Sequence, residues 1–378
     1  MHPNAEVLAW DPDPINMVAV RSLRVEAELS NLVLHEQPHP PSSVDEHFDI
    51  VVLDGLVDAV DGERRTELIA TAASQLRPGG LLCITYRTVV GWGEIVPIVR
   101  LLRHAVHRTS RDVAESVEDA LVLLEIFRER NVGYQANRPM VRAWVDALLK
   151  SGVDEVAAEY VRRDLCPTSH AQIDDVLTSA GASFVGSALL DDDLPEDVPK
   201  ELAALVRTAP SRVLRESLTD LLLRRSSRAD LFTLGGPMEA AAAHTQRIKR
   251  LSLTAFGADP YLVDVRPDLS LTDQADAQPA LGRLTSRCRT TGELWAGVTA
   301  QERQRMFVQT LRTGGAHPVR DGELNPEAVA ASARLTRILE GTGTPKPQRH
   351  IVTPLVGSAV PAGIAMDRAH LRYLQGRK

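Results

Sequence analysis

The first ninety residues alternate between short apolar runs and amphipathic stretches. Four apolar runs have the length and composition of strands, and they lie at 7–10, 31–35, 48–53 and 81–86. Two stretches with the apolar spacing of a helix lie between them, at 15–29 and 68–76. Unbroken apolar runs are typical of strands buried on both faces of a sheet. The pattern predicts an α/β fold with a doubly wound, mostly parallel sheet, in which 51–53 and 82–85 are adjacent and fully buried.

After residue 92 the pattern becomes mostly helical. Helices are expected at 113–127, from Pro139, from Ser169 to Ala180 and twice within 197–223, with one strand at 182–190. A Gly-Gly-Pro turn at 235–237 marks a boundary, and 281–320 then follows a helix, turn, helix, strand pattern like that of a winged helix. The predicted domains are a sheet domain at 1–92, a helical domain at 93–235 and an α-rich domain at 236–378. The stretch at 341–347 is expected to be a linker.

Composition narrows the classes of function. The 378 residues carry a net charge of -7, which gives no support for nucleic-acid binding, and no basic face stands on the helix expected at 301–311. Three scattered cysteines suggest neither a metal site nor a disulfide framework. No signal peptide and no stretch of about twenty apolar residues is present. A cytoplasmic protein without a membrane or nucleic-acid partner is therefore expected.

An acidic residue stands where the first strand ends. Asp11 follows the run 7–10 and is followed at once by Pro12. In nucleotide-binding α/β folds, an acidic residue at a strand tip accepts hydrogen bonds from a ribose. The alternative is an Asp that starts a turn before proline. Glu36 stands after the second apolar run, where a solvated loop carboxylate is the alternative to a binding role.

Two segments resemble a known family. Phe48-Asp-Ile-Val-Val-Leu-Asp-Gly55, with Leu-Arg-Pro-Gly-Gly-Leu-Leu at 76–82, is similar to the fourth and fifth strands of class I S-adenosylmethionine-dependent methyltransferases. The resemblance implies a Rossmann-like sheet in which Asp11 binds the cofactor's ribose and Glu36 its adenine. It also implies that Asp54 and Gly55 line the methyl-transfer site.

A seven-residue stretch at 86–92 carries a more specific resemblance. Tyr86-Arg-Thr-Val-Val-Gly-Trp92 resembles the Tyr-Asn-Thr-Tyr-Pro-Gly-Trp signature of a bacterial subfamily that joins a methyltransferase domain to a predicted regulatory domain. Tyr86, Arg87 and Trp92 become candidates for the acceptor side of the site, although Arg87 replaces the Asn of the signature. For Trp92, a packing anchor between domains is the favoured alternative.

The family's first strand and its Gly-x-Gly loop have no counterpart in these residues. That loop lets the backbone approach the methionine part of the cofactor, so this chain alone is expected to bind S-adenosylmethionine weakly or not at all. A late start, a non-catalytic domain that closes up, and a strand supplied by a partner are all open explanations. Self-association or a protein partner is expected, with Phe127 and Trp144 at the contact.

The favoured function is methyl transfer from S-adenosylmethionine to an unidentified acceptor, and no catalytic residue is assigned. The alternative is a catalytically degenerate subunit, a pseudoenzyme that serves as a binding or regulatory partner. No motif of another chemistry competes. His104 and His107 have helical spacing and are expected to be exposed rather than metal ligands, and the arginines at 224–228 are expected to form a solvated charge run.

Overall fold

The computed structural model describes most of the chain up to residue 235 and only pieces beyond it. The described residues are 6–37, 39–41, 47–107, 112–161, 164–188, 198–235, 246, 248–250, 252–255, 280, 283–284, 289–312, 316–319, 351–353 and 364–366. The chain divides into two units, one formed by Met1–Ser42 with Met238–Lys378 and one by Ser43–Pro237. Each is described by itself.

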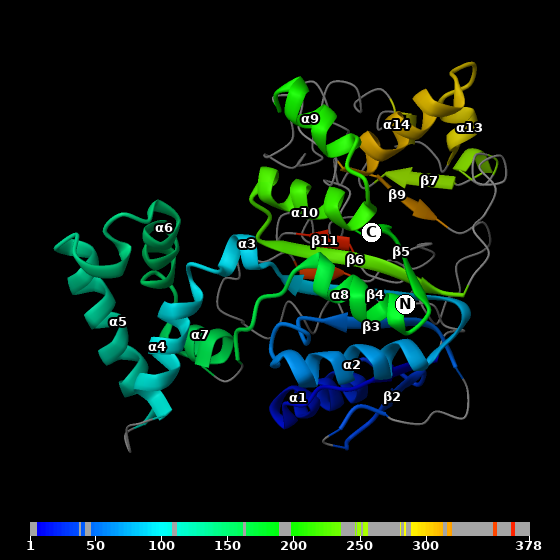
Figure 1. The fold of residues 1–378 in the computed structure, drawn as a ribbon. Coiled ribbons are helices and arrows are strands. Elements are labelled where there is room, and N and C mark those ends of the chain that lie inside the picture. The colour runs from blue at the N-terminus through cyan, green and yellow to red at the C-terminus, as the bar shows by residue number, and fades with distance from the viewer. Residues whose placement is uncertain are drawn as a thin grey trace. The chain divides into compact units, whose positions relative to one another are not determined.

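A four-stranded sheet is the centre of the unit Ser43–Pro237 (Figure 1). Its strands, in spatial order, are β3 (Phe48–Asp54), β4 (Leu76–Arg87), β6 (Ser227–Leu234) and β5 (Ala182–Ser187). β3 runs parallel to β4, whereas β6 is antiparallel to both of its neighbours. The predicted adjacency is confirmed, because Val51 pairs with Leu82 and Leu53 with Ile84.

The prediction that these strands are fully buried is wrong for both: on β4, Leu82 and Ile84 are buried but Cys83 and Thr85 are only partly buried, and β3 is more exposed still. Leu53 is buried, but Ile50 and Val52 on the other face are 40% and 56% exposed. Leu53 lies in the core that α2 and α8 cover, whereas Ile50 and Val52 alternate to the opposite face of β3, which is partly open to solvent. An unbroken apolar run therefore identified a strand without showing how deeply it is buried.

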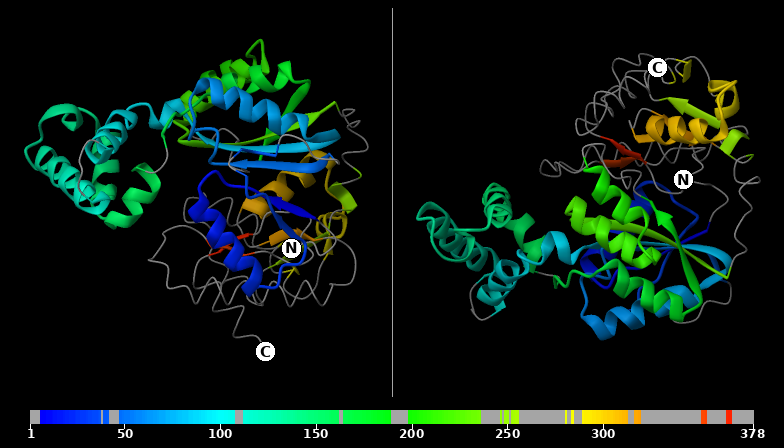
Figure 2. Two further views of the ribbon diagram at one scale, coloured as in Figure 1. Left: turned by 90° about the horizontal axis from the view of Figure 1, so that it is seen from below. Right: turned by 45° about the horizontal axis from the view of Figure 1, so that its top comes forward.

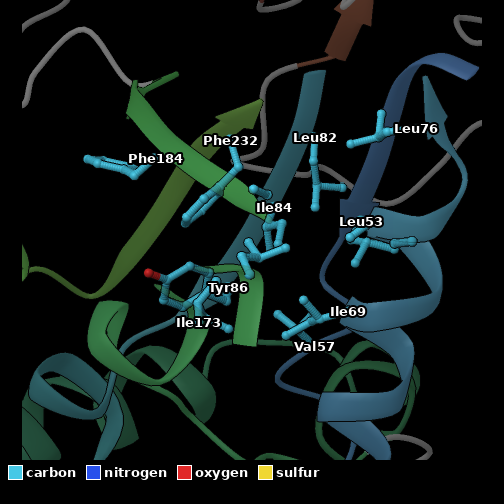
Figure 3. Packing of buried hydrophobic residues seen from close by; sticks show 14 residues of the cluster. Leu53, Val57, Ile69, Leu76, Leu82, Ile84, Tyr86, Ile173, Phe184 and Phe232 are labelled. Atoms are coloured by element: carbon cyan, nitrogen blue, oxygen red, sulfur yellow. The ribbon is translucent and has the colours of Figure 1, made fainter. Parts of the chain in front are cut away.

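Two helices cover one face of the sheet. The core contains Leu82, Ile84 and Tyr86 of β4, which alternate toward the same side (Figure 3). Ile69 of α2 (Gly62–Ser74) and Ile173 of α8 (His170–Ser179) pack against them. Ser169 caps α8 in a capping box with Gln172, as its position in the sequence predicted.

A helical group lies beside the sheet, at the end where β4 leads into α3 (Val89–Trp92) (Figure 2). It consists of α4 (Val96–His107), α5 (Val113–Glu129), a short 3-10 turn η1 (Gly133–Gln135), α6 (Pro139–Leu148), α7 (Val153–Val156) and the π-helical turn η2 (Ala157–Val161). Its core is separate from that of the sheet and includes Leu102, Val117 and Val145. The helices expected from residue 113 and from Pro139 are confirmed.

The remaining elements of this unit are the two helices expected within 197–223, α9 (Lys200–Arg207) and α10 (Arg212–Leu223). The sheet takes β3 and β4 from before residue 92, and β5 and β6 from after it. The domain limits drawn from the sequence stay predictions.

The other unit contains a small parallel pair of strands at its N-terminal side. β1 (Val7–Ala9) and β2 (Leu32–Leu34) pair in parallel, and α1 (Pro14–Glu26) connects them. Leu23 of α1 packs in a small apolar cluster with Ala9, Leu29, Leu32 and Leu34.

The described part of the C-terminal region contains more strand than the sequence pattern suggested. Its elements are β7 (Ser252–Ala255), β8 (Arg289–Thr290), α13 (Thr291–Leu294), α14 (Ala300–Arg312), β9 (Ala316–Val319), β10 (Ile351–Thr353) and β11 (Ile364–Met366). β7 pairs with both β8 and β9. The strand β9 follows α14 as the pattern predicted, the strands β7 and β8 were not expected, and the winged-helix assignment stays a prediction. The linker expected at 341–347 lies outside the described residues.

Neither a membrane-spanning helix nor a metal-binding cluster is found among the described residues. Among the helices placed there, none has both the length and the apolar character needed to cross a membrane. The same residues contain no group of three or more His, Cys, Asp or Glu side chains arranged to hold a metal ion. His104 and His107 are exposed on α4, as expected.

Candidate functional site

Asp11 and Glu36 lie at the same edge of the small β1–β2 sheet. The register pairs Ala9 with Leu34, and each acidic residue follows the carboxyl end of its strand by two positions. The indole N–H of Trp10 donates to the carbonyl of Gln37 at 2.9 Å and ties the two strand ends together. In open α/β sheets, ligands bind at the carboxyl ends of parallel strands, so both acids stand at the expected edge.

The Asp11 carboxylate is part of the turn that starts α1. Its Oδ1 accepts the backbone N–H of Asp13 at 2.7 Å and its Oδ2 the side-chain amide of Asn16 at 2.9 Å. Asp13 then caps the helix by accepting the N–H of Ile15 at 2.9 Å. The turn role that the sequence left as an alternative is therefore present. A carboxylate has about four acceptor positions, so these two bonds do not exclude a hydroxyl donor.

Glu36 is held by a surface ion pair. Its Oε1 accepts the Arg21 guanidinium at 2.5 Å, and both side chains are about half exposed. Such a pair is weak in water and exchanges readily. Glu36 could therefore accept a different donor, such as the amine of an adenine.

Asp54 and Gly55 are fixed by Thr85 of the neighbouring strand. The Thr85 hydroxyl donates to Asp54 Oδ1 and accepts the Gly55 N–H at 2.9 Å. Gly55 has φ near +60°, a conformation that glycine adopts without strain. The chain consequently turns sharply at the carboxyl end of β3, and the Asp54 side chain stays exposed there.

Arg87, at the carboxyl end of β4, lies between two carboxylates. Its backbone N–H and its Nη1 donate to Asp58 Oδ2 at 3.2 and 3.3 Å, and its Nη2 pairs with Glu159 of η2. The guanidinium carbon also lies over the Trp92 ring, 4.9 Å from the centroid. The Arg87 side chain is 25% exposed, whereas Asp58 is 1% exposed. We call these three charged residues and Trp92 the Arg87 cluster.

Trp92 is a packing anchor, the alternative that the sequence favoured. Its ring lies 6.4 Å from those of Trp144 and Tyr160, which are themselves 5.3 Å apart in an edge-on arrangement. The trio joins α3 to α6 and η2, and so connects the sheet to the helical group. Trp144, expected at a contact with another molecule, is partly buried against Trp92 and Tyr160 in this unit. Association stays a prediction.

Tyr86, expected near an acceptor, points into the core. It is 2% exposed, and its hydroxyl donates to Asp230 of β6 at 2.6 Å. His170 Nδ1 donates to the same carboxylate at 2.9 Å, and Arg228 Nε reaches its other oxygen at 2.9 Å. Burial by itself raises the pKa of Asp230, but the bonds from His170 and Tyr86 and the charge of Arg228 outweigh it and lower that pKa.

The arginines at 224–228 are not a solvated charge run, so that expectation is corrected. Arg228 is buried and pairs with Asp230, with Asp220 at 2.6 Å and with Glu216 at 2.8 Å. Arg225 also reaches Asp220, at 3.3 Å, and only Arg224 stays exposed, as the left-handed cap of α10. We call Tyr86, His170, Asp230, Arg228 and their partners on α10 the Asp230 cluster.

Contacts in the structure explain the residues at the signature positions that this chain shares. The Thr88 hydroxyl donates to the carbonyl of Arg225 and accepts the Gly91 N–H at 3.1 Å, which caps α3. A Cβ at Gly91 would come within 2.9 Å of that same carbonyl, so only glycine fits. Tyr86, Thr88 and Gly91 thus tie β4 and α3 to β6 and the residues before it, and Trp92 packs against the helical group. Arg87, where the sequence departs from the signature, carries the charged contacts.

Sequence reasoning missed six residues of these clusters: Asp58, Glu159, His170, Glu216, Asp220 and Asp230. The contacts to Arg87 span 29 residues for Asp58 and 72 for Glu159. No local spacing reveals such pairs. Asp230 had a usable signal, because Arg228, Asp230 and Phe232 alternate as the inward residues of a strand do.

Comparison with known proteins agrees with this architecture. Residues 154–233 match the family model described as "Predicted methyltransferase regulatory domain". The structure is similar to that of PKMT2 from Rickettsia typhi, with a TM-score of 0.59, 14% identity, and coverage of 84% of this chain and 66% of that one. For PKMT2 in complex with AdoHcy, the TM-score is 0.60, again at 14% identity, with 84% and 67% covered.

A sequence relative is known in a cyanobacterium. The uncharacterized protein sll1526 of Synechocystis sp. is 23% identical over 256 residues, which cover 66% of this chain. This chain matches 50% of that relative's length and about two thirds of PKMT2. The α/β fold expected from the sequence is confirmed: the chain has the fold of PKMT2, and its residues 154–233 match the model of a predicted methyltransferase regulatory domain.

Proposed function

We propose that this chain takes part in methyl transfer from S-adenosylmethionine and that Asp11 contributes the ribose contact. The observation that carries the proposal is the position of Asp11 and Glu36 past the carboxyl ends of two adjacent parallel strands. The complex of PKMT2 with AdoHcy supports the same class of cofactor. The acceptor of the methyl group is not part of the proposal.

The described residues fit the adenosine half of this cofactor. A ribose offers two hydroxyl donors and adenine offers an amine, and the carboxylates of Asp11 and Glu36 are acceptors for such groups. The methionine half needs donors for its carboxylate, and the carboxylates of Asp11 and Glu36 cannot supply them. When bound, the cofactor supplies an activated methyl group on its sulfonium. This chain's own residues would bind and orient its nucleoside.

Weak binding by this chain alone is part of the proposal. No Gly-x-Gly stands between Met1 and Asp11 to offer backbone donors. Two missing charge-assisted hydrogen bonds, at about 1.5–3 kcal/mol each, weaken binding by roughly a hundredfold or more. Saturation-transfer NMR with S-adenosylhomocysteine should therefore detect binding that calorimetry places well above the low-micromolar range. A low-micromolar constant contradicts the weak-binding proposal, and no signal at millimolar ligand contradicts the cofactor assignment.

The control for Asp11 is Asp13, because both carboxylates accept hydrogen bonds at the start of α1. Asp11→Asn keeps one acceptor for the turn and removes the charge that a ribose would use, so the NMR signal should fall severalfold. Asp13→Asn changes the other carboxylate at the start of α1 and should leave the signal unchanged. Equal losses in both variants would mean that Asp11 only supports the helix.

A catalytically degenerate binding subunit is the competing function, and no contact described above favours it. Methyl transfer is measured with tritiated S-adenosylmethionine and a lysate of the native host as the source of acceptors. Incorporation that depends on Asp11 supports the enzyme. Nucleoside binding without incorporation supports the degenerate subunit.

A further inference from the structure

Two arginines hold the loop that follows β3. This loop, residues 55–61, starts at Gly55 and leads into α2. Arg87 donates to the Asp58 carboxylate, as described above, and Arg65 donates to the carbonyls of Val57 at 2.7 Å and Val60 at 3.1 Å. The loop is thus fixed by guanidinium groups from β4 and from α2.

The same two arginines also reach residues 157–161 and 164–166 of the matched region, which we call the regulatory segment. Arg87 pairs with Glu159, and Arg65 Nη2 donates to the carbonyl of Cys166 at 2.6 Å. The Cys166 N–H in turn donates to the carbonyl of Asp58 at 2.8 Å. The segment lies inside the match at 154–233, so the regulatory domain contacts the loop through both arginines.

Asp58 makes this contact sensitive to Arg87. Its carboxylate is 1% exposed, and its Oδ1 is a buried atom with no hydrogen-bond partner among the described residues. A buried carboxylate needs a paired cation, because desolvation penalises the isolated charge heavily. Arg87 is the cation that pairs with it directly, while Arg65 acts on it only through its nearby charge. The orientation of Arg87 depends in turn on Glu159 and on the Trp92 ring.

We infer that Arg87 is a positioning residue through which the regulatory segment, residues 157–161 and 164–166, controls the conformation of the loop 55–61. When Glu159 holds the guanidinium, Asp58 stays buried and the loop keeps its place. When Glu159 releases the Arg87 guanidinium, the ion pair between Arg87 and Asp58 weakens and the loop 55–61 opens. Any effect on the cofactor rests on the proposed function, whereas the coupling between segment and loop does not.

Hydrogen–deuterium exchange on the full chain without cofactor tests the coupling. Glu159→Gln removes one charge on the regulatory segment and changes no residue of the loop. It should speed exchange in a peptide covering 55–61 by roughly tenfold, because a charge-assisted bond that stabilises the closed state is lost. Glu155→Gln, an exposed carboxylate on α7, is the matched control and should change nothing. Faster exchange confined to 157–161, or an equal effect of the control, overturns the inference.

A double-mutant cycle separates coupling from general destabilisation. Arg87→Asn should loosen both segments, and Glu159→Gln added to it should loosen the loop no further. Additive effects would show that the two residues act independently and would overturn the inference. If Arg87→Asn does not fold, the Glu159→Gln comparison alone decides.

Binding of S-adenosylhomocysteine is then compared in the wild type and Glu159→Gln. Weaker binding that accompanies the faster exchange shows that the regulated loop serves the cofactor site. Absence of binding in the wild type refutes the proposed function and leaves the exchange result standing.

Discussion

The Asp230 cluster and the Arg87 cluster are built from the same chemistry in one unit, yet they differ in burial and in what they join. Asp230 and His170 are fully buried, and their bonds connect β4, β6, α8 and α10 within the sheet's own core. Arg87 is a quarter exposed and links the sheet to the helical group. Buried ionic groups with every charge paired are costly to break, whereas pairs near water are easily adjusted. The first arrangement suits a fixed structure, and the second suits a contact that changes.

The largest expected effect comes from breaking the buried cluster. Asp230→Ala leaves the Tyr86 hydroxyl and His170 Nδ1 without their acceptor and takes one carboxylate from Arg228. Removing one partner of a buried ion pair costs about 3–5 kcal/mol. Urea unfolding should show a loss of that size. Asp175→Ala, on the exposed side of α8, should stay within about 0.5 kcal/mol of the wild type. Equal losses would remove the distinction between the clusters.

The pH dependence of stability should carry the signature of Asp230. Because its pKa is lowered on folding, its ionised form stabilises the protein above the unfolded value of about 3.9. That stability is lost as pH falls below about 4 toward the folded pKa. The difference in unfolding free energy between the wild type and Asp230→Asn should therefore shrink from pH 6 to pH 3. A constant difference over this range would contradict the lowered pKa.

A smaller effect is expected at the Arg87 cluster. Arg87→Asn restores the residue of the family signature, removes two charge-assisted contacts and leaves Asp58 with the backbone N–H. We expect a loss of about 1.5–3 kcal/mol by urea unfolding. Arg64→Asn, on the exposed side of α2, gives the cost of replacing an unburied arginine. A loss at Arg87 equal to that at Asp230 would show that both clusters serve the fold alike.

What the sequence predicted correctly depended on local patterns. The strands β3 and β4 follow from unbroken apolar runs, and α8 follows from the cap at Ser169. The strand β6 was missed because its inward residues include Arg228 and Asp230. Those charges resemble a solvated segment until their partners on α10 are known.

The candidate site was predictable only where it follows from strand ends. Asp11, Glu36 and Asp54 each lie just past or at the carboxyl end of a strand, which the apolar runs locate. The partners of Arg87 could not be predicted, since Asp58 and Glu159 come from a loop and a π-helical turn with no pattern of their own. Tyr86 belonged to a recognisable motif, but the motif did not show that its hydroxyl faces the core.

The smallest effect is expected for the ion pair between Arg21 and Glu36. This pair is more exposed than either the Asp230 cluster or the Arg87 cluster. Both side chains are 52% exposed, so water already solvates each charge and the pair contributes about 0–1 kcal/mol. Arg21→Gln should therefore change the unfolding free energy by less than 1 kcal/mol at low salt, and the change should vanish in about 1 M salt, where the Debye length is about 3 Å.

The Arg21→Gln variant frees the Glu36 carboxylate, so it should strengthen the NMR signal of S-adenosylhomocysteine if that carboxylate accepts the adenine amine. An unchanged signal, with Asp11→Asn still lowering it, would confine the nucleoside contact to Asp11.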